Sequence, residues 1–555
     1  MNSNQISNQE IAEQLNLLAK LIEIHGENSF RAKAYSTAAF KIEKLAYNLY
    51  EKPLEQVRIA GIGEGILATI QEIITTGQFE LLQEYLEKTP AGVLDLLKVK
   101  GLGPKKIAQL WKGLEIESID ELADACTENK LMLLKGFGLA SQNSILKSIE
   151  FLRAQKGFFL YATIEELADQ LIALFLSHFP DAHTSFIGAW RRQETVINEL
   201  ELLTTAPLQT ISSFLIEQFP AAQMDIQGSY LILEMPEWVK VVIDFSSVEN
   251  FYKRLFETTN TSEFNEAFLS RYQLPLTPLS ESEIFEKNGL SMIHPALRES
   301  QYSLERYGKA FVQLIQPSDI KGIIHSHSTY SDGRNSILEM ALAAQEKGYE
   351  YLVMSDHSQT AAYANGLSVE RIQQQHKEID KLNQQMAPFK IFKSIESDIL
   401  NDGSLDYEDS VLAQFDLVIA SIHSNLGMDE KQAIERLIKA IENPYTRILG
   451  HPTGRLLLSR PGYPVDHKKL IDACLANDVV VEINAHPRRL DLDWKWIEYA
   501  IDKGVLLSIN PDAHSTDGMD LVKYGVLAAQ KGGLKPINNL SSFSLIEFED
   551  FLKRK

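Results

Sequence analysis

The pattern of hydrophobic and polar residues changes twice along this 555-residue chain. Over residues 1–150, apolar residues recur at helical spacing in short segments separated by glycine-containing turns, which predicts an all-helical region. Residues 155–315 mix strand-like and helix-like patterns. From residue 317 onward, short runs rich in aliphatic and β-branched residues alternate with amphipathic helical segments. That alternation predicts βα units built around a parallel sheet or barrel.

Polar residues follow the predicted strands of this last region, at the point where each apolar run ends. They are His325, His327 and Asp332 in "IIHSHSTYSDG", Asp356 and His357 in "YLVMSDH", Glu396 and Asp398 in "FKSIESDI", His423 in "LVIASIHS", His451 in "RILGHP", and Asp512 and His514 in "LLSINPDAH". Six of the 13 histidines of the chain belong to this set. Because the carboxyl ends of parallel strands meet at one end of such folds, we expect these side chains to lie together.

A cluster of histidines and carboxylates at one end of a barrel favours a site for several metal ions. A single histidine at a strand end is more often a structural residue than a ligand. Six of them packed beside carboxylates without metal would repel one another when protonated and lose hydration when neutral. Neutral imidazole and carboxylate are natural ligands for Zn, Mn or Fe. Two or three such ions lower the pKa of a bridging water and neutralise the oxygens of a phosphoryl transfer, so phosphoester hydrolysis is the expected chemistry.

Two arginines close to these strand ends are candidates for holding the oxygens of a phosphate. Arg455 occurs in "GHPTGR" and Arg488 in "HPRRL". A guanidinium group binds phosphate through two parallel hydrogen bonds, which makes arginine well suited to this role. The alternative interpretation for both residues is an ordinary solvated arginine at the protein surface.

The composition is that of an ordinary globular protein, with 45% hydrophobic and 23% charged residues. A net charge of −21 excludes capture of nucleic acid by a broad basic surface. Residues 1–150 carry 16 Lys and Arg against 20 Asp and Glu, so any contact with nucleic acid there must be local. With only two cysteines, no long apolar run and a polar start, the chain is expected to be cytoplasmic, with no disulfide framework and no membrane partner.

The strand-end motifs resemble, in order, those of the PHP (polymerase and histidinol phosphatase) domain. The stretches that carry the resemblance are "HSHSTYSDG", "SDHS", "IESD", "SIHS", "GHPTGR" and "PDAH". It implies a distorted seven-stranded (βα) barrel that binds three metal ions. The nine ligands it implies are His325, His327, Asp332, His357, Glu396, His423, His451, Asp512 and His514. Those expected to take part in catalysis are His325, His327, Asp332, Glu396, Asp512 and His514. The family commonly has Asp where Ile323 stands, a position outside the nine ligands.

The rest of the chain resembles the bacterial family X DNA polymerases (PolX) that carry a PHP domain. "LIEIHGENSFRAKAYSTAAFKIEKL" (21–45) is similar to their N-terminal helical domain, and "EIFEKNGLSMIHPALRE" (283–299) is similar to their linker between thumb and PHP domain. The resemblance covers essentially the whole chain. It implies a multidomain fold: an α-helical helix-hairpin-helix N-terminal region, an α+β nucleotidyltransferase-like palm and thumb, and a C-terminal distorted (β/α)7 PHP barrel.

A pattern that occurs three times in the helical region looks like the helix-hairpin-helix element of that family. It reads "IAGIGEGI" (59–66), "VKGLGPKKI" (99–107) and "LKGFGLASQNSI" (134–145). A Gly-x-Gly turn exposes backbone N–H groups at a helix N-terminus, and these bind a DNA phosphate without reading sequence. The residues expected to bind DNA are Gly61, Gly63, Gly101, Gly103 and Lys105. A plain corner between two helices is the alternative, and it is strongest for the third copy.

The palm-like region departs from the pattern of family X polymerases. Those enzymes have Gly-Ser, an arginine pair, two Asp at i and i+2 on one strand, and a third Asp on a later strand, which together hold two Mg ions. In "GAWRRQETVINELELL" (188–203), Glu199 and Glu201 stand at the Asp pair. In "VKVVIDFSSV" the third position is Val242, and Asp244 lies two residues further on. We therefore expect a degenerate palm site with doubtful Mg binding, and neither polymerase nor lyase activity.

These features together predict five segments and a function. The segments are 1–90, a helical DNA-binding domain with a helix-hairpin-helix; 91–154, a fingers-like helical region; 155–240, a palm-like nucleotidyltransferase domain; 241–317, the rest of the palm with a thumb-like domain and linker; and 318–555, a PHP phosphoesterase domain. The expected function is metal-dependent hydrolysis of DNA phosphodiesters, as a 3′→5′ exonuclease or in processing 3′ ends and abasic sites, with non-sequence-specific binding at DNA ends or gaps. The alternatives are a phosphomonoesterase of the histidinol-phosphatase type, a DNA-end-binding scaffold, and a still active DNA polymerase. Metal identity and oligomeric state stay open.

Overall fold

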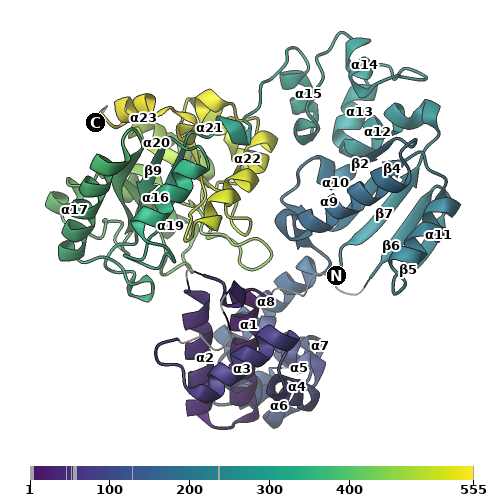
Figure 1. The fold of residues 1–555 in the computed structure, drawn as a ribbon. Coiled ribbons are helices and arrows are strands. Elements are labelled where there is room, and N and C mark those ends of the chain that lie inside the picture. Colours follow the sequence, from purple (N-terminus) through teal and green to yellow (C-terminus); the bar gives the residue numbers. More distant parts are fainter. Residues whose placement is uncertain are drawn as a thin grey trace. The chain divides into compact units, whose positions relative to one another are not determined.

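The computed structural model divides into two compact units, residues 1–156 and 157–555 (Figure 1). It describes residues 6–45, 47–51, 53, 59–127, 129–235 and 238–553. None of the helices in these ranges combines the length and the apolar character that crossing a bilayer requires.

The first unit is helical in all its described secondary structure, as the spacing of apolar residues predicts. Its helices are α1 (Asn8–His25), α2 (Ser29–Glu43), α3 (Glu64–Thr76), α4 (Glu80–Lys88), α5 (Ala91–Asp95), α6 (Pro104–Leu114), α7 (Ile119–Thr127) and α8 (Leu139–Gln155). A capping box between Ser7 and Glu10 starts α1, and Gly26 in the left-handed region ends it. The apolar faces of these helices form one core, in which Leu15, Leu18 and Ile22 are fully buried. Burial of that shared core, rather than the propensity of any single short helix, holds the unit together.

The second unit begins with a mixed α/β region around a five-stranded sheet in the order β2-β4-β7-β6-β5. The strands of the whole mixed region, in which β1 and β3 lie outside this sheet, are β1 (Phe159–Leu160), β2 (Thr184–Phe186), β3 (Val196–Ile197), β4 (Glu199–Thr204), β5 (Gln223–Gln227), β6 (Tyr230–Glu234) and β7 (Lys240–Phe245). Its helices are α9 (Tyr161–His178), α10 (Gly188–Arg191), α11 (Leu208–Gln218), α12 (Phe251–Thr259), α13 (Ser262–Leu269), α14 (Glu281–Glu286) and α15 (Gln301–Tyr307). The pair β4 and β7 is parallel, whereas the other neighbours in this sheet are antiparallel.

The remainder of the second unit is a barrel of seven parallel strands in sequence order from β8 to β14. The strands are β8 (Gly322–Ser326), β9 (Tyr351–Met354), β10 (Lys390–Asp398), β11 (Leu417–Ser421), β12 (Thr446–Leu449), β13 (Val480–Asn484) and β14 (Leu507–Asn510). A parallel bridge between Ser326 and Ala513 brings the ends of β8 and β14 together, so the barrel is nearly closed. The predicted fold, with a helical N-terminal region, a mixed middle and a seven-stranded barrel, is confirmed.

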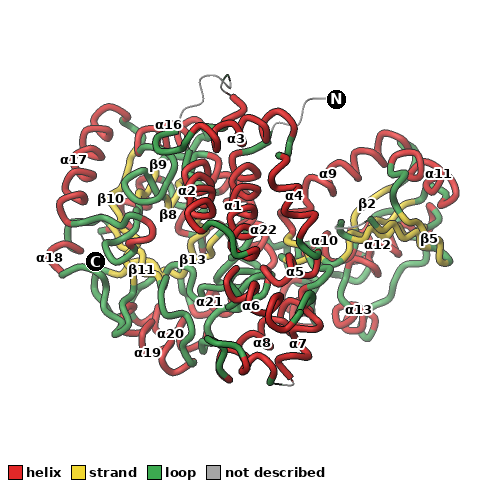
Figure 2. Tube along the Cα trace, turned by 90° about the horizontal axis from the view of Figure 1, so that it is seen from below, coloured by secondary structure: helices red, strands yellow, loops and turns green. Residues whose placement is uncertain are grey.

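Helices lie around the barrel strands (Figure 2), and α23 packs against one end of the barrel. They are α16 (Ile337–Glu346), α17 (Val369–Met386), α18 (Asp409–Leu412), α19 (Glu430–Ile441), α20 (His467–Ala476), α21 (Ile497–Lys503), α22 (Val522–Lys531) and α23 (Leu545–Leu552). Alternate residues of β8 to β13 pack with Phe548 and Phe551 of α23 in one apolar cluster. Because this cluster fills the barrel from the α23 side, polar side chains collect at the other end, where the strands finish.

Helix α22 fastens the barrel to the mixed α/β region through a buried lysine. The side chain of Lys531 is fully buried, and its Nζ lies 3.0 Å from Glu194 Oε1. It also donates to the carbonyl oxygen of Arg192 at 3.2 Å and contacts the carboxylate of Glu299. Nearby, Gln193 donates to Gln530 at 2.9 Å. Removal of the carboxylates would leave the buried ammonium group without a counter-charge, which is strongly destabilising. The contacts of Lys531 therefore hold the two parts of the second unit together.

Replacement of Lys531 by Met should destabilise the second unit by about 1–3 kcal/mol, because the half-buried carboxylates of Glu194 and Glu299 would lose the ammonium group between them, and Glu299 would keep Arg192 as a partner. Urea unfolding followed by tryptophan fluorescence measures this change. Lys535→Met is the matched control. Lys535 lies four residues further along the chain and is exposed, so its replacement should leave the urea unfolding transition unchanged. Equal transitions for the two variants would contradict a structural role for the Lys531 contacts.

Candidate metal centre

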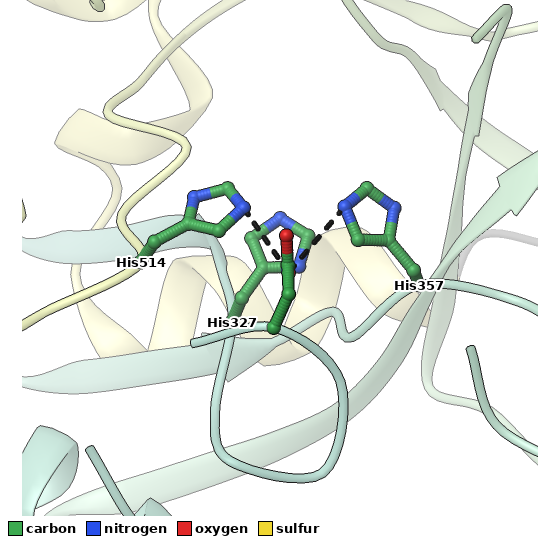
Figure 3. A group of neighbouring side chains, drawn as sticks. His327, His357 and His514 are labelled. Atoms are coloured by element: carbon green, nitrogen blue, oxygen red, sulfur yellow. Dashed lines mark ion pairs between the residues drawn. The ribbon is translucent and has the colours of Figure 1, made fainter. Parts of the chain in front are cut away.

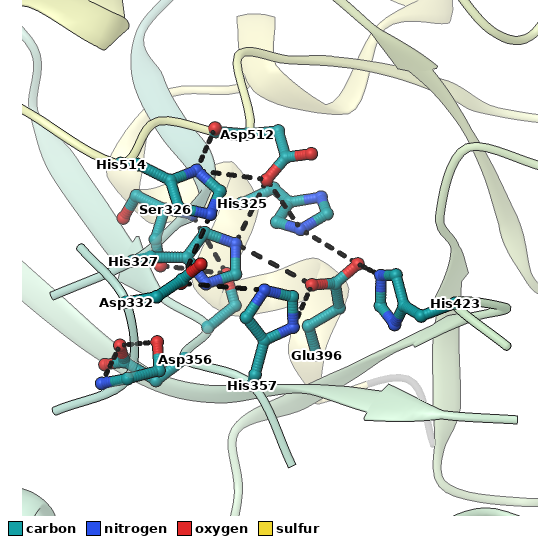
Figure 4. Close-up of polar contacts among 12 residues, drawn as sticks. His325, Ser326, His327, Asp332, Asp356, His357, Glu396, His423, Asp512 and His514 are labelled. Atoms are coloured by element: carbon teal, nitrogen blue, oxygen red, sulfur yellow. Dashed lines mark hydrogen bonds and ion pairs between the residues drawn. The ribbon is translucent and has the colours of Figure 1, made fainter. Parts of the chain in front are cut away.

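The nine predicted ligands lie at the same end of the barrel; Figure 4 labels eight of them, and His451 contacts Glu396 beside them. Apart from Asp332, which lies in the loop after β8, each of them lies near the carboxyl end of a strand, either in its last residues or within four residues after it. The ligand atoms of eight of them fall into three groups, in each of which the atoms lie within 4.8 Å of one another. His451 is outside these groups, and its Nε2 lies 3.1 Å from Glu396 Oε1. The groups are His327, Asp332, His357 and His514; His325, His327 and Asp512; and His357, Glu396 and His423. Two histidines are shared between groups, so the three groups form one continuous centre.

The first group forms around the carboxylate of Asp332. Its Oδ1 lies 3.3 Å from His514 Nε2 and 3.6 Å from His357 Nε2. Figure 3 shows the rings of His327, His357 and His514 pointing toward one another from three different parts of the chain. The ring centroids of His327 and His514 are 4.2 Å apart. Three imidazoles and a carboxylate at this separation form a donor set of the kind that Zn, Mn or Fe takes.

Glu396 is the carboxylate that joins the other two groups. Figure 4 shows it between His357 and His423. Its distances to histidine nitrogens are 2.9 Å to His357 Nδ1, 3.1 Å to His423 Nε2, 3.1 Å to His451 Nε2, 3.3 Å to His325 Nε2 and 3.7 Å to His327 Nε2. The residue is fully buried on β10. A buried carboxylate in reach of five imidazoles is in the position of a ligand shared by neighbouring ions.

Several of these atoms are buried but make no hydrogen bond in the described structure. They include His325 Nε2, His357 Nδ1 and Glu396 Oε2, although groups of opposite character lie within 4 Å of each. Buried polar atoms without partners are rare because each costs about 1–3 kcal/mol. Lone pairs that converge without bonding one another suit ligands directed at shared ions, so the residues present fit divalent metal.

Burial and neighbouring side chains set the pKa values of the groups in this cluster. Burial would raise the pKa of Glu396, but His423, His325 and His357 hold that pKa well below its usual range. Burial lowers the pKa of His327 to about 3, with His514 and His357 adding to the effect. The carboxylate is therefore ionised and His327 neutral, which are the protonation states that metal binding needs.

The backbone at two of the ligands is in the left-handed region that favours glycine. The φ angle is +66° at His325 and +53° at Asp512. For residues other than glycine this costs about 1–3 kcal/mol each, and such strain concentrates at functional sites. The two residues are joined through the bridge that closes the barrel, since the N–H of Ala513 donates to the carbonyl oxygen of His325 at 3.1 Å. The surrounding ladder thus holds both side chains toward the centre.

Glu482 is a buried residue of this site that the sequence pattern did not single out. It lies on β13 with no exposed surface, and the Nδ1–H of His325 donates to its Oε2 at 2.7 Å. The N–H of His451 and the amide of Asn510 donate to the same carboxylate at 3.0 and 2.8 Å. Because Nδ1 is engaged, Nε2 of His325 faces the centre with its lone pair. An acidic residue inside the apolar run "DVVVEINA" was the signal that could have revealed it.

Two further carboxylates at strand ends orient ligands without belonging to the predicted nine. Asp398 bonds to Nδ1 of His423, which leaves the Nε2 of that histidine toward Glu396. Asp356 is fully buried and accepts hydrogen bonds from the N–H groups of Ser328 and Ser331 at 2.8 and 3.0 Å. These bonds hold the loop that carries His327 and Asp332.

The two predicted phosphate-binding arginines occupy different positions. Arg455 donates to the carbonyl oxygen of Arg489 at 2.8 Å and also to Asp493 and to the carbonyl oxygen of Leu490. Its guanidinium group is thus engaged in holding the loop after β13, which argues against a free phosphate contact. Arg488 is exposed. Arg489, which was not predicted, lies with its Nε 3.9 Å from Asp512 Oδ2, beside the metal centre.

The carboxylates of the predicted degenerate palm site do not converge. Lys240 lies opposite Glu199 and pairs with it at 2.5 Å, and Arg254 pairs with the buried Asp244 at 2.7 Å. Asp244 is opposite Leu203 in the parallel register rather than beside the glutamates.

The carboxylate of Glu201 packs closely against the backbone of Gly188. A Cβ on Gly188 would lie 1.6 Å from its carboxylate, and burial raises the pKa of Glu201. In the part of the chain that the structure describes, the candidate metal groups all belong to the barrel. Cations of the chain itself neutralise Glu199 and Asp244, so this site does not fit the pair of Mg ions that nucleotidyl transfer needs.

The three Gly-x-Gly turns of the first unit have one geometry. Each is closed by a hydrogen bond, from Ile62 to Ile59, from Leu102 to Val99 and from Phe137 to Leu134, at 3.1, 3.2 and 3.2 Å. The first glycines have φ of +71°, +91° and +90° at Gly61, Gly101 and Gly136, and the second glycines, Gly63, Gly103 and Gly138, are the N-caps of α3, α6 and α8.

The first two turns differ from the third in their caps. No side chain caps the first turn of α3 or α6, so their N–H groups are available to an anion, whereas Ser141 bonds to Gly138 in α8. Lys105, in the first turn of α6, is exposed. The predicted glycines Gly63 and Gly103 are therefore placed where a phosphate can reach uncapped backbone N–H groups.

Replacement of Glu482 by Gln should weaken divalent metal binding by about 10–100-fold, because His325 would lose the charged partner that orients its ring. Calorimetric titration of the metal-free protein with Mn measures the effect. Glu346→Gln, on the exposed face of α16, is the control and should bind as the unchanged protein does. Unaltered affinity in the Glu482 variant would show that β13 does not position the ligands.

Comparison with known proteins agrees with the geometry of both units. Residues 6–79 match the family model of a helix-hairpin-helix domain, residues 93–150 that of a SAM-like helix-hairpin-helix tandem, and residues 324–486 that of the PHP domain. A probable phosphatase of Thermoanaerobacter is 32% identical over 167 residues, which is 29% of this chain and 62% of that protein. The DNA polymerase/3′-5′ exonuclease PolX of Bacillus subtilis is 36% identical over 567 residues, covering 98% of this chain and 99% of that protein. Because the match extends over both chains almost completely, this chain belongs to the PolX family.

Proposed function

We propose that this protein hydrolyses phosphodiester bonds at the 3′ ends of DNA, removing nucleotides in the 3′→5′ direction. The observation that carries the proposal is the gathering of nine histidine and carboxylate side chains, Glu396 and Asp332 among them, at one end of the barrel. The name of the Bacillus subtilis relative, which includes a 3′-5′ exonuclease, supports the same reaction. Processing of blocked 3′ ends and abasic sites is chemically the same hydrolysis and belongs to the proposal.

The proposed centre holds three divalent ions, taken from Mn, Zn or Fe, through the nine ligands. Bound ions would supply a hydroxide near neutral pH and neutral surroundings for the oxygens of the scissile phosphate. Glu396 and Asp332 keep the histidines of different strands at ligand distance, while Glu482 and Asp398 fix which ring nitrogen faces inward. The residues proposed to contact the reacting groups are His325, His327, Asp332, Glu396, Asp512 and His514.

DNA binding is proposed for the first unit. The two segments 1–90 and 91–154 would bind the sugar–phosphate backbone at DNA ends or gaps. The contacts would come from the uncapped helix N-termini at the turns of Gly61, Gly63, Gly101 and Gly103, with Lys105 beside them. Such contacts need no extended basic surface, which agrees with the acidic chain. A DNA substrate would place the activity in the cytoplasm of a bacterial cell. We assign residues 318–555 to the phosphoesterase and 155–240 and 241–317 to a palm-like and thumb-like scaffold.

We further propose that the scaffold no longer polymerises DNA, although the relative from Bacillus subtilis is named a polymerase as well. The pairing of Glu199 with Lys240 and of Asp244 with Arg254 supports this, because each pair removes a ligand from any Mg site. The arginine pair next to Gly188 is also engaged: Arg191 with Glu281 at 2.7 Å, and Arg192 with Glu299 at 3.2 Å.

One observation favours a second candidate. The barrel region is similar to probable phosphatases, which suggests a phosphomonoesterase acting on a small substrate. The helix-hairpin-helix domains of the first unit would then have no role in the reaction. A DNA-end-binding scaffold is the candidate without catalysis, and any metal-dependent turnover excludes it.

Incubation of a 5′-labelled primer–template with the protein and Mn should shorten the primer one nucleotide at a time. His325→Ala or Asp512→Ala should lower that rate by about 100-fold or more, because each removes a ligand. His178→Ala, on the exposed face of α9, is the control and should keep the rate. Added dNTPs should not lengthen the primer.

Gel electrophoresis with denaturing conditions separates these outcomes. Primer extension would contradict the proposed loss of polymerase activity. Shortening that survives in both ligand variants would contradict the barrel as the nuclease, and release of phosphate only from monoesters would favour the phosphatase.

Replacement of both Gly63 and Gly103 by Asp should lower DNA affinity by about 10-fold or more, because a carboxylate would occupy the proposed phosphate position. The fold should be kept, since Asp is a good N-cap and a Cβ at either position meets nothing within 4 Å. Fluorescence anisotropy with a labelled gapped duplex measures the affinity, and thermal unfolding checks the fold. Unchanged anisotropy curves would assign DNA binding to another surface.

A further inference from the structure

An exposed tyrosine lies at the rim of the metal centre, in the loop between β9 and α17. The ring centroid of Tyr363 is 6.0 Å from that of His357 and 6.5 Å from that of His423. The interplanar angles are 60° and 67°, so neither imidazole stacks on the tyrosine. Its side chain is 66% exposed. Among the described residues these two histidines are the only rings in contact with it, which leaves its faces open to solvent.

The backbone that carries Tyr363 is firmly held on both sides. Ala361 and Ala364 are buried at 0% and 1% exposure. The N–H of Leu367 donates to the carbonyl oxygen of His357 at 2.9 Å, and the N–H of Thr360 donates to Asp406 at 2.7 Å. These contacts fix the loop without help from the tyrosine ring. A single exposed aromatic ring is common at a protein surface, so exposure alone gives Tyr363 no role. What distinguishes it is its place beside two of the predicted metal ligands, His357 and His423.

The surroundings of the ring distinguish which part of a DNA strand could lie on it. The carboxylates of Asp398, Glu396 and Asp332 are the charged groups that act on Tyr363, with Arg489 opposing them. An anionic phosphate would be repelled by these carboxylates except where metal neutralises them. An uncharged nucleobase is not repelled, and its flat face stacks on an aromatic side chain whatever its sequence. A nucleotide whose phosphate lies at the metal centre extends its base within reach of this rim.

We propose that Tyr363 is a stacking platform for the base of the 3′-terminal nucleotide, the one that leaves during hydrolysis. The inference rests on the proposed 3′→5′ hydrolysis and adds to it a specificity residue and the group that this residue recognises. Stacking seats the terminal nucleotide so that its 5′ phosphate, the scissile group, lies at the ligands His357 and His423. A strand whose last base is paired must first unpair it to use this platform, so the site prefers frayed or single-stranded ends.

Tyr363→Ala tests the platform with three single-stranded oligonucleotides that differ at the 3′ end. One ends in a normal nucleotide, one in an abasic tetrahydrofuran nucleotide, and one has the tetrahydrofuran at the penultimate position. On the normal end the variant should lose about 10-fold in kcat/KM, mainly through a higher KM. On the terminally abasic strand the unchanged protein should already be about 10-fold slower, and the variant should add no further loss.

Tyr363→Phe should restore hydrolysis of the normal end, because stacking needs the ring and not the hydroxyl. Phe311→Ala removes another exposed ring, 80% exposed in the linker before the barrel, and should have no effect. Metal content of each variant, measured by atomic emission, reports any damage to the centre.

Each remaining outcome overturns a stated part of the account. An equal loss of rate on normal and terminally abasic strands would make Tyr363 a structural residue and overturn the platform. Dependence on the penultimate base instead of the terminal one would overturn the assigned nucleotide. If the unchanged protein shortened none of the three strands while retaining metal, the proposed function would fail, and the platform with it.

Discussion

The fully buried carboxylate of Glu396 is the constraint on which the barrel end depends. Ring nitrogens of five histidines from four different strand ends lie within 3.7 Å of it. A charge with no exposed surface is tolerated only when it is paired or ligates metal. Around it several buried atoms, among them His325 Nε2 and His357 Nδ1, make no hydrogen bond in the described structure, an arrangement that is costly alone and favourable once shared ions are bound.

The rest of the second unit can be understood as support for that arrangement. The apolar cluster under α23 fills one end of the barrel, so the polar strand ends gather at the other. Glu482 and Asp398 orient two of the histidines from outside the ligand set, and the backbone strain at His325 and Asp512 is held by the bridge that closes the barrel. Lys531 then ties helix α22 to the mixed α/β region, whose own charged residues are paired internally. The proposed loss of the palm site is consistent with retention of the palm fold, because its arginines and glutamates are engaged in pairs within that region.

Much of the barrel end was predictable from the sequence because its signal repeats. A polar residue after each of several apolar runs is improbable by chance, and parallel strands must bring such residues to one end, so the grouping of His423 with Glu396 followed from pattern alone. Glu482 was not predictable in this way, since it lies within a strand and only the folded register reveals that its carboxylate meets His325. Comparison with the family pattern predicted a degenerate palm site at Glu199, Glu201 and Asp244, but it gave no sign that Lys240 would pair with Glu199 and Arg254 with Asp244. Arg455 and Tyr363 show the same limit, because the partners of one and the exposure of the other depend on loops whose course the hydrophobic pattern does not determine.

Anomalous diffraction from crystals of the protein grown with Mn tests the central claim most directly. The account predicts three strong peaks at the end of the barrel, with Glu396 and Asp332 each within bonding distance of an ion and His325 binding through Nε2. It also predicts no peak among Glu199, Glu201 and Asp244. A peak between those palm carboxylates, or barrel peaks whose ligands leave out Glu396, would contradict the claim that the barrel end is the one metal-dependent centre of this chain.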